Sequence, residues 1–242
     1  MVSRRTAPGN RTAVSQIRHG FTRTELLVII AVILIPAGML LPALSQTREE
    51  EEQAMCINNL KQLGQIYRIY AEDFDGWSPF GGYNPADKTT WSDVLINAGY
   101  VGAQKSGQPS VFVCPTTKPK TWWSHWNTYG TRACFNNPTG NPVYYRIGSN
   151  PIVTTDPTND AGGNAAQFIL IADSIMTNTA NADFGKQEYY LDSPRESGGS
   201  SRIYLNHNGM ANVLFGDGHA ESCTYSTLHN TYHWLDLQAT GL

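Results

Sequence analysis

A long apolar run near the start of the chain constrains its fold more than any other feature. Residues 26–44 (LLVIIAVILIPAGMLLPAL) contain no charged side chain. At about 1.5 Å per residue, a helix of this length nearly spans a bilayer core of about 30 Å. A carboxylate at the entrance to such a segment is costly, so Glu25 is a candidate functional residue. The run predicts one membrane-spanning helix over residues 21–45.

The charges that precede this run predict the orientation of the helix in the membrane. Residues 1–20 contain four arginines and no acidic residue. Basic segments stay on the cytoplasmic side of a membrane, so the remainder of the chain should lie on the opposite side. Removal of residues 1–20 would change the formal net charge from −3 to −7. An acidic product argues against nucleic acid as a partner.

Beyond the apolar run, a helical pattern continues through residues 46–75. Apolar residues recur there at steps of three and four, which is typical of an amphipathic helix; they are Ala54, Ile57, Leu60, Leu63, Tyr67 and Tyr70. We expect this stripe to pack on a soluble domain, with packing between subunits as the alternative. The turn-forming residues 73–76 (DFDG) should end the helix.

Residues 76–242 have the composition of a globular, β-rich domain. Short apolar segments at residues 110–114 and 167–172 are expected to be strands. Gly216-Asp217-Gly218 lies between two alternating segments, residues 211–215 and 219–222, which strongly indicates a hairpin.

The hexapeptide before the apolar run, residues 20–25 (GFTRTE), resembles the cleavage and methylation motif of type IV pilins and type II secretion pseudopilins. The resemblance implies that prepilin peptidase cuts between Gly20 and Phe21 and methylates the new amine of Phe21. It also implies that Glu25 pairs with the N-terminal amine of a neighbouring subunit during assembly. Arg23 and Thr24 stand where that family usually has apolar residues.

A second motif lies near the other end of the chain. His207 is followed after nine residues by Asp217 and Gly218. With the segments CINNLKQLGQIYRIYAEDFDGWSP, FVCP and FGDGH, this spacing resembles a pseudopilin-like family of Planctomycetes, Verrucomicrobia and Lentisphaerae that carries a prepilin-processing-associated domain.

These resemblances imply an α+β, pilin-like fold. A long N-terminal helix, membrane-spanning in its first half, would pack on a small antiparallel β-sheet domain. The expected parts are a leader (residues 1–20), a transmembrane helix (21–45), its amphipathic continuation (46–75) and a periplasmic domain (76–242).

The function implied is that of a structural subunit and not of an enzyme. The subunit would be held in the inner membrane by a single helix, with a cytoplasmic N-terminus and a periplasmic C-terminal domain. After processing it would enter a type II secretion or type IV pilus-like fibre in the periplasm. Its partners would be prepilin peptidase, other pilin or pseudopilin subunits and inner-membrane lipid.

The four cysteines allow three disulfide pairings, since export would expose them to an oxidising compartment. We favour Cys56–Cys114 and Cys134–Cys223. None of the four shows C-x-x-C spacing or Cys/His spacing suited to zinc, so a metal cluster and a cofactor are not expected.

Three weaker hypotheses remain for the polar motifs: a metal site, a hydrolase site and a calcium site. His207, Asp217 and His219 offer two imidazoles and a carboxylate for a metal, or a membrane-tethered hydrolase site, although hairpin chemistry alone explains the Asp-Gly pair. Asp73 and Asp75 resemble the start of a calcium loop, but the twelfth position lacks a Glu, which leaves only a looser calcium site.

The alternative function is a secreted or membrane-tethered binding protein. Ordinary signal peptidase could cleave after Ser45, because a small-residue segment there follows an arginine-containing region and an apolar segment. The first residue of the mature protein distinguishes the two hypotheses. It would be Gln46 for the binding protein and Phe21 for the subunit.

Overall fold

The chain divides into two compact units, Met1–Gln46 and Thr47–Leu242. The computed structural model describes residues 21–132, 143–147, 149, 152–154, 164–191, 200–234 and 237–239. One helix, α1 (Arg23–Asp73), contributes to both units. Among the described residues, no helix is both long enough and apolar enough to cross a membrane.

The second half of α1 belongs to the globular unit because it buries one face. Its buried residues follow the spacing of a helical stripe, and they are Cys56, Leu60, Leu63, Tyr67, Tyr70 and Ala71. Ala54 is exposed and Ile57 only half-buried, so the stripe begins at Cys56. The helix ends where Gly76, at a φ of +87°, donates its N–H to the Ala71 carbonyl.

The largest sheet has five strands in the order β11-β10-β6-β3-β8. The strands are β3 (Gly130–Arg132), β6 (Ile169–Ala172), β8 (Tyr190–Leu191), β10 (Met210–Phe215) and β11 (Ala220–Thr224). The β10–β11 pair is the hairpin expected around Gly216-Asp217-Gly218. Strands β3 and β8 pair in parallel, whereas the other pairs are antiparallel.

A second sheet has three strands in the order β12-β9-β7, and two short pairs complete the β structure. The three strands are β7 (Ser174–Met176), β9 (Ser201–Leu205) and β12 (Leu237–Ala239). Strands β9 and β12 are parallel. The short pairs are β1 (Tyr83–Asn84) with β2 (Thr89–Thr90), and β4 (Tyr145–Arg146) with β5 (Val153–Thr154).

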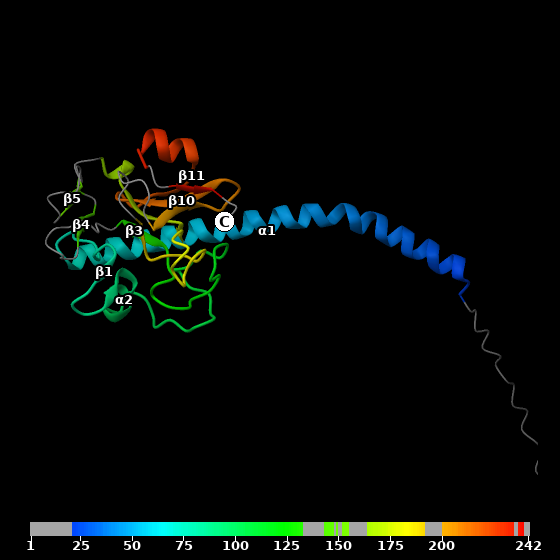
Figure 1. The fold of residues 1–242 in the computed structure, drawn as a ribbon, viewed down its shortest axis with the longest axis horizontal. Coiled ribbons are helices and arrows are strands. Elements are labelled where there is room, and N and C mark those ends of the chain that lie inside the picture. The colour runs from blue at the N-terminus through cyan, green and yellow to red at the C-terminus, as the bar shows by residue number, and fades with distance from the viewer. Residues whose placement is uncertain are drawn as a thin grey trace, which may run out of the picture. The chain divides into compact units, whose positions relative to one another are not determined.

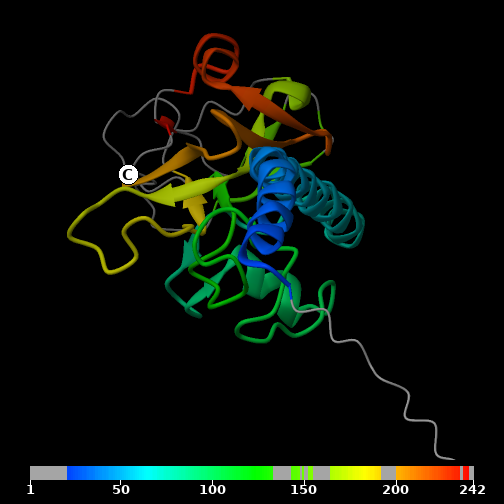
Figure 2. The same ribbon diagram turned by 90° about the vertical axis from the view of Figure 1, so that its right-hand side faces the viewer.

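Three short helices join these strands. They are α2 (Trp91–Asn97), the 3₁₀ turn η1 (Ala165–Gln167) and the π-helical turn η2 (Thr227–Thr231). In both ribbon views the orange strands β10 and β11 lie between the red coil of η2 and the cyan part of α1 (Figures 1 and 2). The hairpin is therefore enclosed by helical structure on two sides.

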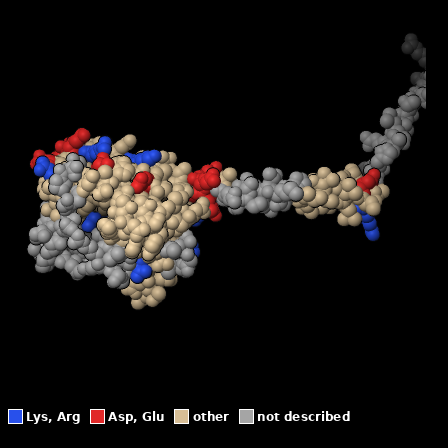
Figure 3. All heavy atoms as spheres, turned by 90° about the horizontal axis from the view of Figure 1, so that it is seen from above, with Lys and Arg blue, Asp and Glu red and all other residues tan. Residues whose placement is uncertain are grey.

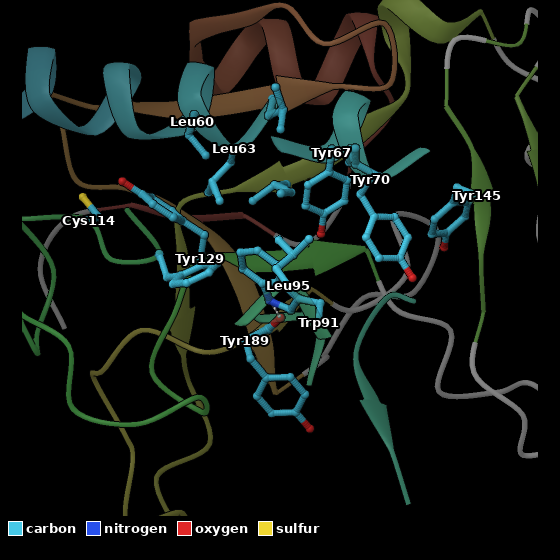
Figure 4. Close-up of a cluster of buried hydrophobic side chains, with 14 of the residues drawn as sticks. Leu60, Leu63, Tyr67, Tyr70, Trp91, Leu95, Cys114, Tyr129, Tyr145 and Tyr189 are labelled. Carbon is cyan, nitrogen blue, oxygen red and sulfur yellow. Dashed lines mark hydrogen bonds between the residues drawn. The ribbon is translucent and has the colours of Figure 1, made fainter. Parts of the chain in front are cut away.

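Two hydrophobic clusters fill the globular unit. The larger joins the stripe of α1 to α2 and to buried aromatic residues from the loops, as Figure 4 shows for Tyr67, Trp91 and Tyr129. The smaller contains Phe215, Leu228 and Trp234, between the sheets and η2. The indole N–H of Trp91 donates to the Tyr189 carbonyl (3.1 Å), which satisfies a polar group inside the larger cluster.

The expectation of an α+β, pilin-like fold with a membrane-spanning helix packed on a small antiparallel sheet is wrong. The described chain is a mixed α/β structure with four helical elements and several separate sheets. Two of its strand pairings are parallel. The hairpin signals in the sequence report only antiparallel neighbours, whereas strands joined by long connections can pair in either direction.

The strand expected at residues 110–114 does not form. This segment consists of turns, although Phe112, Val113 and Cys114 are buried. Its backbone bonds isolated partners instead of a strand: the Phe112 carbonyl accepts from Tyr129 N (2.8 Å), and Cys114 N donates to Gln187 Oε1 (3.2 Å). The apolar residues of this segment therefore indicated that it is buried, and not that it pairs with another strand.

Candidate functional site

The residues after the expected cleavage point form the capped start of α1. Thr22 N and Thr22 Oγ1 each donate to Glu25 Oε2 at 2.8 Å, while Glu25 N donates to Thr22 Oγ1 at 3.2 Å. This reciprocal arrangement is a capping box, which satisfies N–H groups that a helix start leaves unpaired. The Glu25 carboxylate therefore has a local structural role. Gly20 lies outside the described residues.

The apolar segment that follows is exposed. Phe21 is 76% exposed, and the large residues between Leu26 and Ile35 are 42–66% exposed. Figure 3 shows this segment as an uncharged surface with charges only at its start. Exposed apolar side chains in continuous series are typical of surfaces that contact lipid or other protein subunits.

A cluster of four buried polar residues lies within the globular unit. Cys56 comes from α1, Cys114 from the turns before Pro115, Asp173 from the junction of β6 and β7, and His207 from the segment between β9 and β10. Each is at most 3% exposed. One ligand atom from each lies within 4.8 Å of the others, and this is the only such group of three or more among the described residues. We call these residues the Cys/Asp/His cluster.

The contacts of this cluster converge on one imidazole nitrogen. Nε2 of His207 lies 3.3 Å from Asp173 Oδ2 and 3.4 Å from Cys114 Sγ. Thr116 Oγ1 lies 3.3 Å from the same nitrogen. Cys56 Sγ donates to Asp173 Oδ1 at 3.2 Å, so a chain of close contacts joins all four residues.

Neighbouring donors surround the cluster. Tyr129 Oη donates to Cys56 Sγ (3.2 Å), and its hydroxyl is seen beside Cys114 in Figure 4. Asn212 N donates to Asp173 Oδ2 (2.8 Å). Cys114 Sγ lies 2.8 Å from Thr116 Oγ1. These donors stabilise negative charge on sulfur and oxygen atoms that are removed from water.

The electrostatics of the cluster favour charge on two of its groups, Cys114 and His207, whereas burial raises the pKa of the Cys56 thiol well above its ordinary value. Burial opposes ionisation of Cys114, but hydrogen bonds with Cys56 and His207 outweigh it and hold the pKa of this thiol well below its ordinary value. Burial would likewise lower the pKa of His207, but hydrogen bonds with Asp173 and Cys114 raise that pKa to about 10. Burial raises the pKa of Asp173 to about 6, and the hydrogen bond with His207 partly opposes this rise.

This arrangement does not fit nucleophilic catalysis. In a catalytic triad the acid contacts the imidazole nitrogen opposite the nucleophile, whereas Asp173 and Cys114 both lie at Nε2 of His207. Nδ1 of His207 is buried and, among the described residues, has no hydrogen-bond partner. Cys114 is also fully buried, so no substrate reaches its sulfur. Thiolate, imidazole and carboxylate side chains that face each other could instead hold a metal ion.

The histidine and the aspartate of the His207/Asp217 motif have different surroundings. His207 belongs to the Cys/Asp/His cluster, whereas Asp217 lies in the β10–β11 turn, where its Oδ1 accepts from His219 N (3.0 Å) and lies 2.5 Å from His219 Nδ1. Gly218 adopts a φ of +88°, and the Asp217 carbonyl accepts from Arg68 Nη2 of α1. Asp217 and Gly218 therefore build a turn that contacts the helix.

The other candidates for metal ligands are also separate. Asp73 Oδ2 accepts from Tyr100 Oη (2.5 Å) at the end of α1, and Asp75 lies in the following turn with a φ of +50°. Within the described part of the chain, neither belongs to a group of three ligand side chains.

The described cysteines are free thiols. Cys56 and Cys114, which we expected to pair, have sulfur atoms within 4.8 Å but are not bonded to each other. Cys223 is buried and donates to Glu221 Oε1 (3.4 Å). Cys134 lies outside the described residues, and so does its expected pairing with Cys223.

Asp173 is the residue of the cluster that sequence reasoning missed. Its signal is an acidic residue directly after the apolar strand segment at residues 167–172, where a continued strand would bury it. A buried carboxylate needs partners, and those partners come from distant parts of the chain.

Comparisons with known proteins add no relative. No protein-family model, curated protein or solved structure matches the chain.

Proposed function

We propose that the chain is a pseudopilin-like structural subunit that assembles through the N-terminal part of α1. The observation that carries the proposal is the exposed apolar segment at residues 26–35, which follows directly after Glu25 of the Gly20–Glu25 motif. Apolar side chains in such a series are stabilised by lipid before assembly and by the helices of neighbouring subunits afterwards. No chemical step is required of the chain.

In this proposal prepilin peptidase removes residues 1–20 and methylates Phe21. The subunit is held in the inner membrane, with its globular unit in the periplasm, until it enters a fibre. The start of α1 at Arg23, two residues after the expected cut, supports the order of events, because the new amine would lie beside a helix that is already capped.

Glu25 has two separable roles in this scheme. Its carboxylate caps α1 through Thr22, and it would also offer a negative charge to the amine of a neighbouring subunit. An ammonium and a carboxylate that meet in lipid offset part of the cost of removing each from water. The capping bond needs only a side-chain oxygen, whereas the intersubunit contact needs the charge.

The test begins with the mature N-terminus. The full chain is expressed in a bacterial host with and without prepilin peptidase, and its N-terminus is determined by mass spectrometry. We expect methylated Phe21 only when the peptidase is present. An N-terminus at Gln46, or no peptidase-dependent cut, contradicts the proposal and, in the first case, supports an exported binding protein.

Two substitutions then separate the roles of Glu25. Glu25→Gln keeps a capping oxygen but removes the charge, whereas Thr22→Ala weakens the cap and keeps the charge. We expect Glu25→Gln to be processed normally and to reduce the fraction recovered in sheared fibres. We expect Thr22→Ala to assemble more nearly like the wild type. Normal assembly of Glu25→Gln contradicts the role of the charge.

A further inference from the structure

We propose that Cys56, Cys114, Asp173 and His207 bind one Zn²⁺ in a closed site that joins α1 to the β-sheets. The inference is independent of the proposed function, because it concerns only the globular unit. It rests on the positions of four side-chain ligand atoms, on their chemistry and on their burial.

Three of the separations among the ligand atoms are close to those of a tetrahedral zinc site. With Zn–S of about 2.3 Å and Zn–N or Zn–O of about 2.0–2.2 Å, neighbouring ligand atoms of a tetrahedron lie about 3.3–3.8 Å apart. Asp173 Oδ2 lies 3.3 Å from His207 Nε2, which lies 3.4 Å from Cys114 Sγ. Asp173 Oδ1 lies 3.2 Å from Cys56 Sγ. The ligand atoms of all four residues lie within 4.8 Å of one another, so one ion would contact all four once the more distant pairs move closer.

Hydrogen bonding alone does not account for the convergence on His207. An imidazole nitrogen either donates one hydrogen or accepts one with its single lone pair. Nε2 of His207 nevertheless has three partners within 3.4 Å, Asp173, Cys114 and Thr116. Only one of these contacts can be a full hydrogen bond at a time. A cation at the centre would use the lone pair and would contact the sulfur and carboxylate atoms directly.

The donor set selects the metal. Two thiolates, one imidazole and one carboxylate are ligands that Zn²⁺ accepts in four-coordinate sites. Mg²⁺ and Ca²⁺ require oxygen ligands in larger number, which two cysteines cannot supply. The side chains of Asp173 and His207 are 0% exposed, so all four positions belong to the protein and none is open to water. A closed site of this kind is structural and not catalytic.

The surrounding donors fit the charge of such a site. Two thiolates and a carboxylate carry three negative charges, and Zn²⁺ neutralises two of them. Tyr129 Oη and the backbone N–H of Asn212 point at ligand atoms, so they stabilise the remaining negative charge. Bonds of this type to metal ligands commonly change metal affinity by about 10–100-fold when removed.

The position of the site gives the ion a mechanical role. Its ligands come from α1, from the turns before Pro115, from the β6–β7 junction and from the segment between β9 and β10. These segments are distant in the sequence, and Cys56 is the ligand on the helix. Zn²⁺ would therefore cross-link the helix to both larger sheets, and its binding energy would become folding energy.

The test measures metal in the full chain. Protein is expressed with zinc chloride, purified in detergent without chelators, and analysed by mass spectrometry for metal content and by X-ray absorption at the zinc edge. We expect about one Zn²⁺ per chain, with two sulfur ligands at about 2.3 Å. Wild-type protein that contains no zinc after reconstitution, zinc without sulfur ligands, or a metal-free Cys56–Cys114 disulfide overturns the proposal.

Variants locate the ion. Cys114→Ser should lose the bound zinc, whereas Cys223→Ser, which also changes a buried cysteine but lies outside the cluster, should retain it. Tyr129→Phe keeps the ring and removes the hydroxyl that bonds Cys56, and it should weaken zinc binding against a competing chelator by about 10-fold. Equal zinc content and affinity in all three variants contradicts the assigned ligands. If Cys114→Ser does not fold, the Tyr129→Phe result and the wild-type absorption spectrum decide.

Discussion

The contact between α1 and the β10–β11 turn can be tested by a single methyl group. Gly64 is a buried residue on α1, and a Cβ atom added there would lie 2.9 Å from Leu214 Cδ1 and 3.0 Å from the Gly218 carbonyl oxygen. Gly64→Ala should gain about 1 kcal/mol from helix propensity. Overpacking of a filled site costs about 1–3 kcal/mol.

The second effect should exceed the first, because one of the two close atoms belongs to the backbone. The Leu214 side chain can adjust. The Gly218 carbonyl is less free to move, because Gly218 has a φ of +88° in a tight turn. We expect the free energy of unfolding to fall by about 1 kcal/mol. With a urea dependence of about 1–3 kcal/mol per M, the midpoint should fall by roughly 0.3–1 M.

The assay is urea unfolding of the full chain followed by tryptophan fluorescence. Gly102→Ala is the matched control, because a Cβ atom there has no other atom within 4 Å. This control should unfold at or slightly above the wild-type midpoint. Leu214→Val combined with Gly64→Ala should show a favourable coupling, since it removes the nearer clash. A Gly64→Ala protein as stable as the wild type refutes the packing argument.

Two further predictions concern polar contacts of the same unit. The hydrogen bond with Asp73 raises the pKa of Tyr100 to about 12, above its ordinary value of about 10. The stabilisation from this contact is therefore complete below pH 10 and is lost as the pH rises through about 12. In ultraviolet titrations the phenol that Tyr100→Phe removes should therefore ionise near pH 12, and ionisation near pH 10 would contradict the bond. Asp217→Ala removes the acceptor for His219 N and should lower the free energy of unfolding by about 1 kcal/mol, whereas His219→Ala keeps that backbone bond and should have a smaller effect in the same urea assay.

Local patterns in the sequence located local structure. The alternating segments around Asp217-Gly218 correctly predicted the β10–β11 hairpin, because the turn of a hairpin depends on residues that are adjacent in the sequence. The three- and four-residue spacing found Leu60, Leu63, Tyr67 and Tyr70 on the buried face of α1. It missed Cys56, since the apolar positions Ala54 and Ile57 gave a competing start to the stripe.

Features that depend on distant residues could not be found in this way. Spacing rules for zinc sites recognise ligands that are close in the sequence, whereas Cys56, Cys114, Asp173 and His207 come from four separate segments. The same limit explains the error about the sheets. The parallel pairing of β3 with β8 depends on a long connection whose path no local pattern encodes.

The strand order of the five-stranded sheet has a consequence for the timing of folding. Of its pairings, only β10–β11 joins strands that are neighbours along the chain. A hairpin forms within about 1–10 μs, whereas sheets built from distant strands form much more slowly. We therefore expect the hairpin to be an early structure and the rest of the sheet to be a late one. Until that sheet forms, the apolar face of α1 stays in water, which makes this interval the one in which the chain is most prone to aggregate.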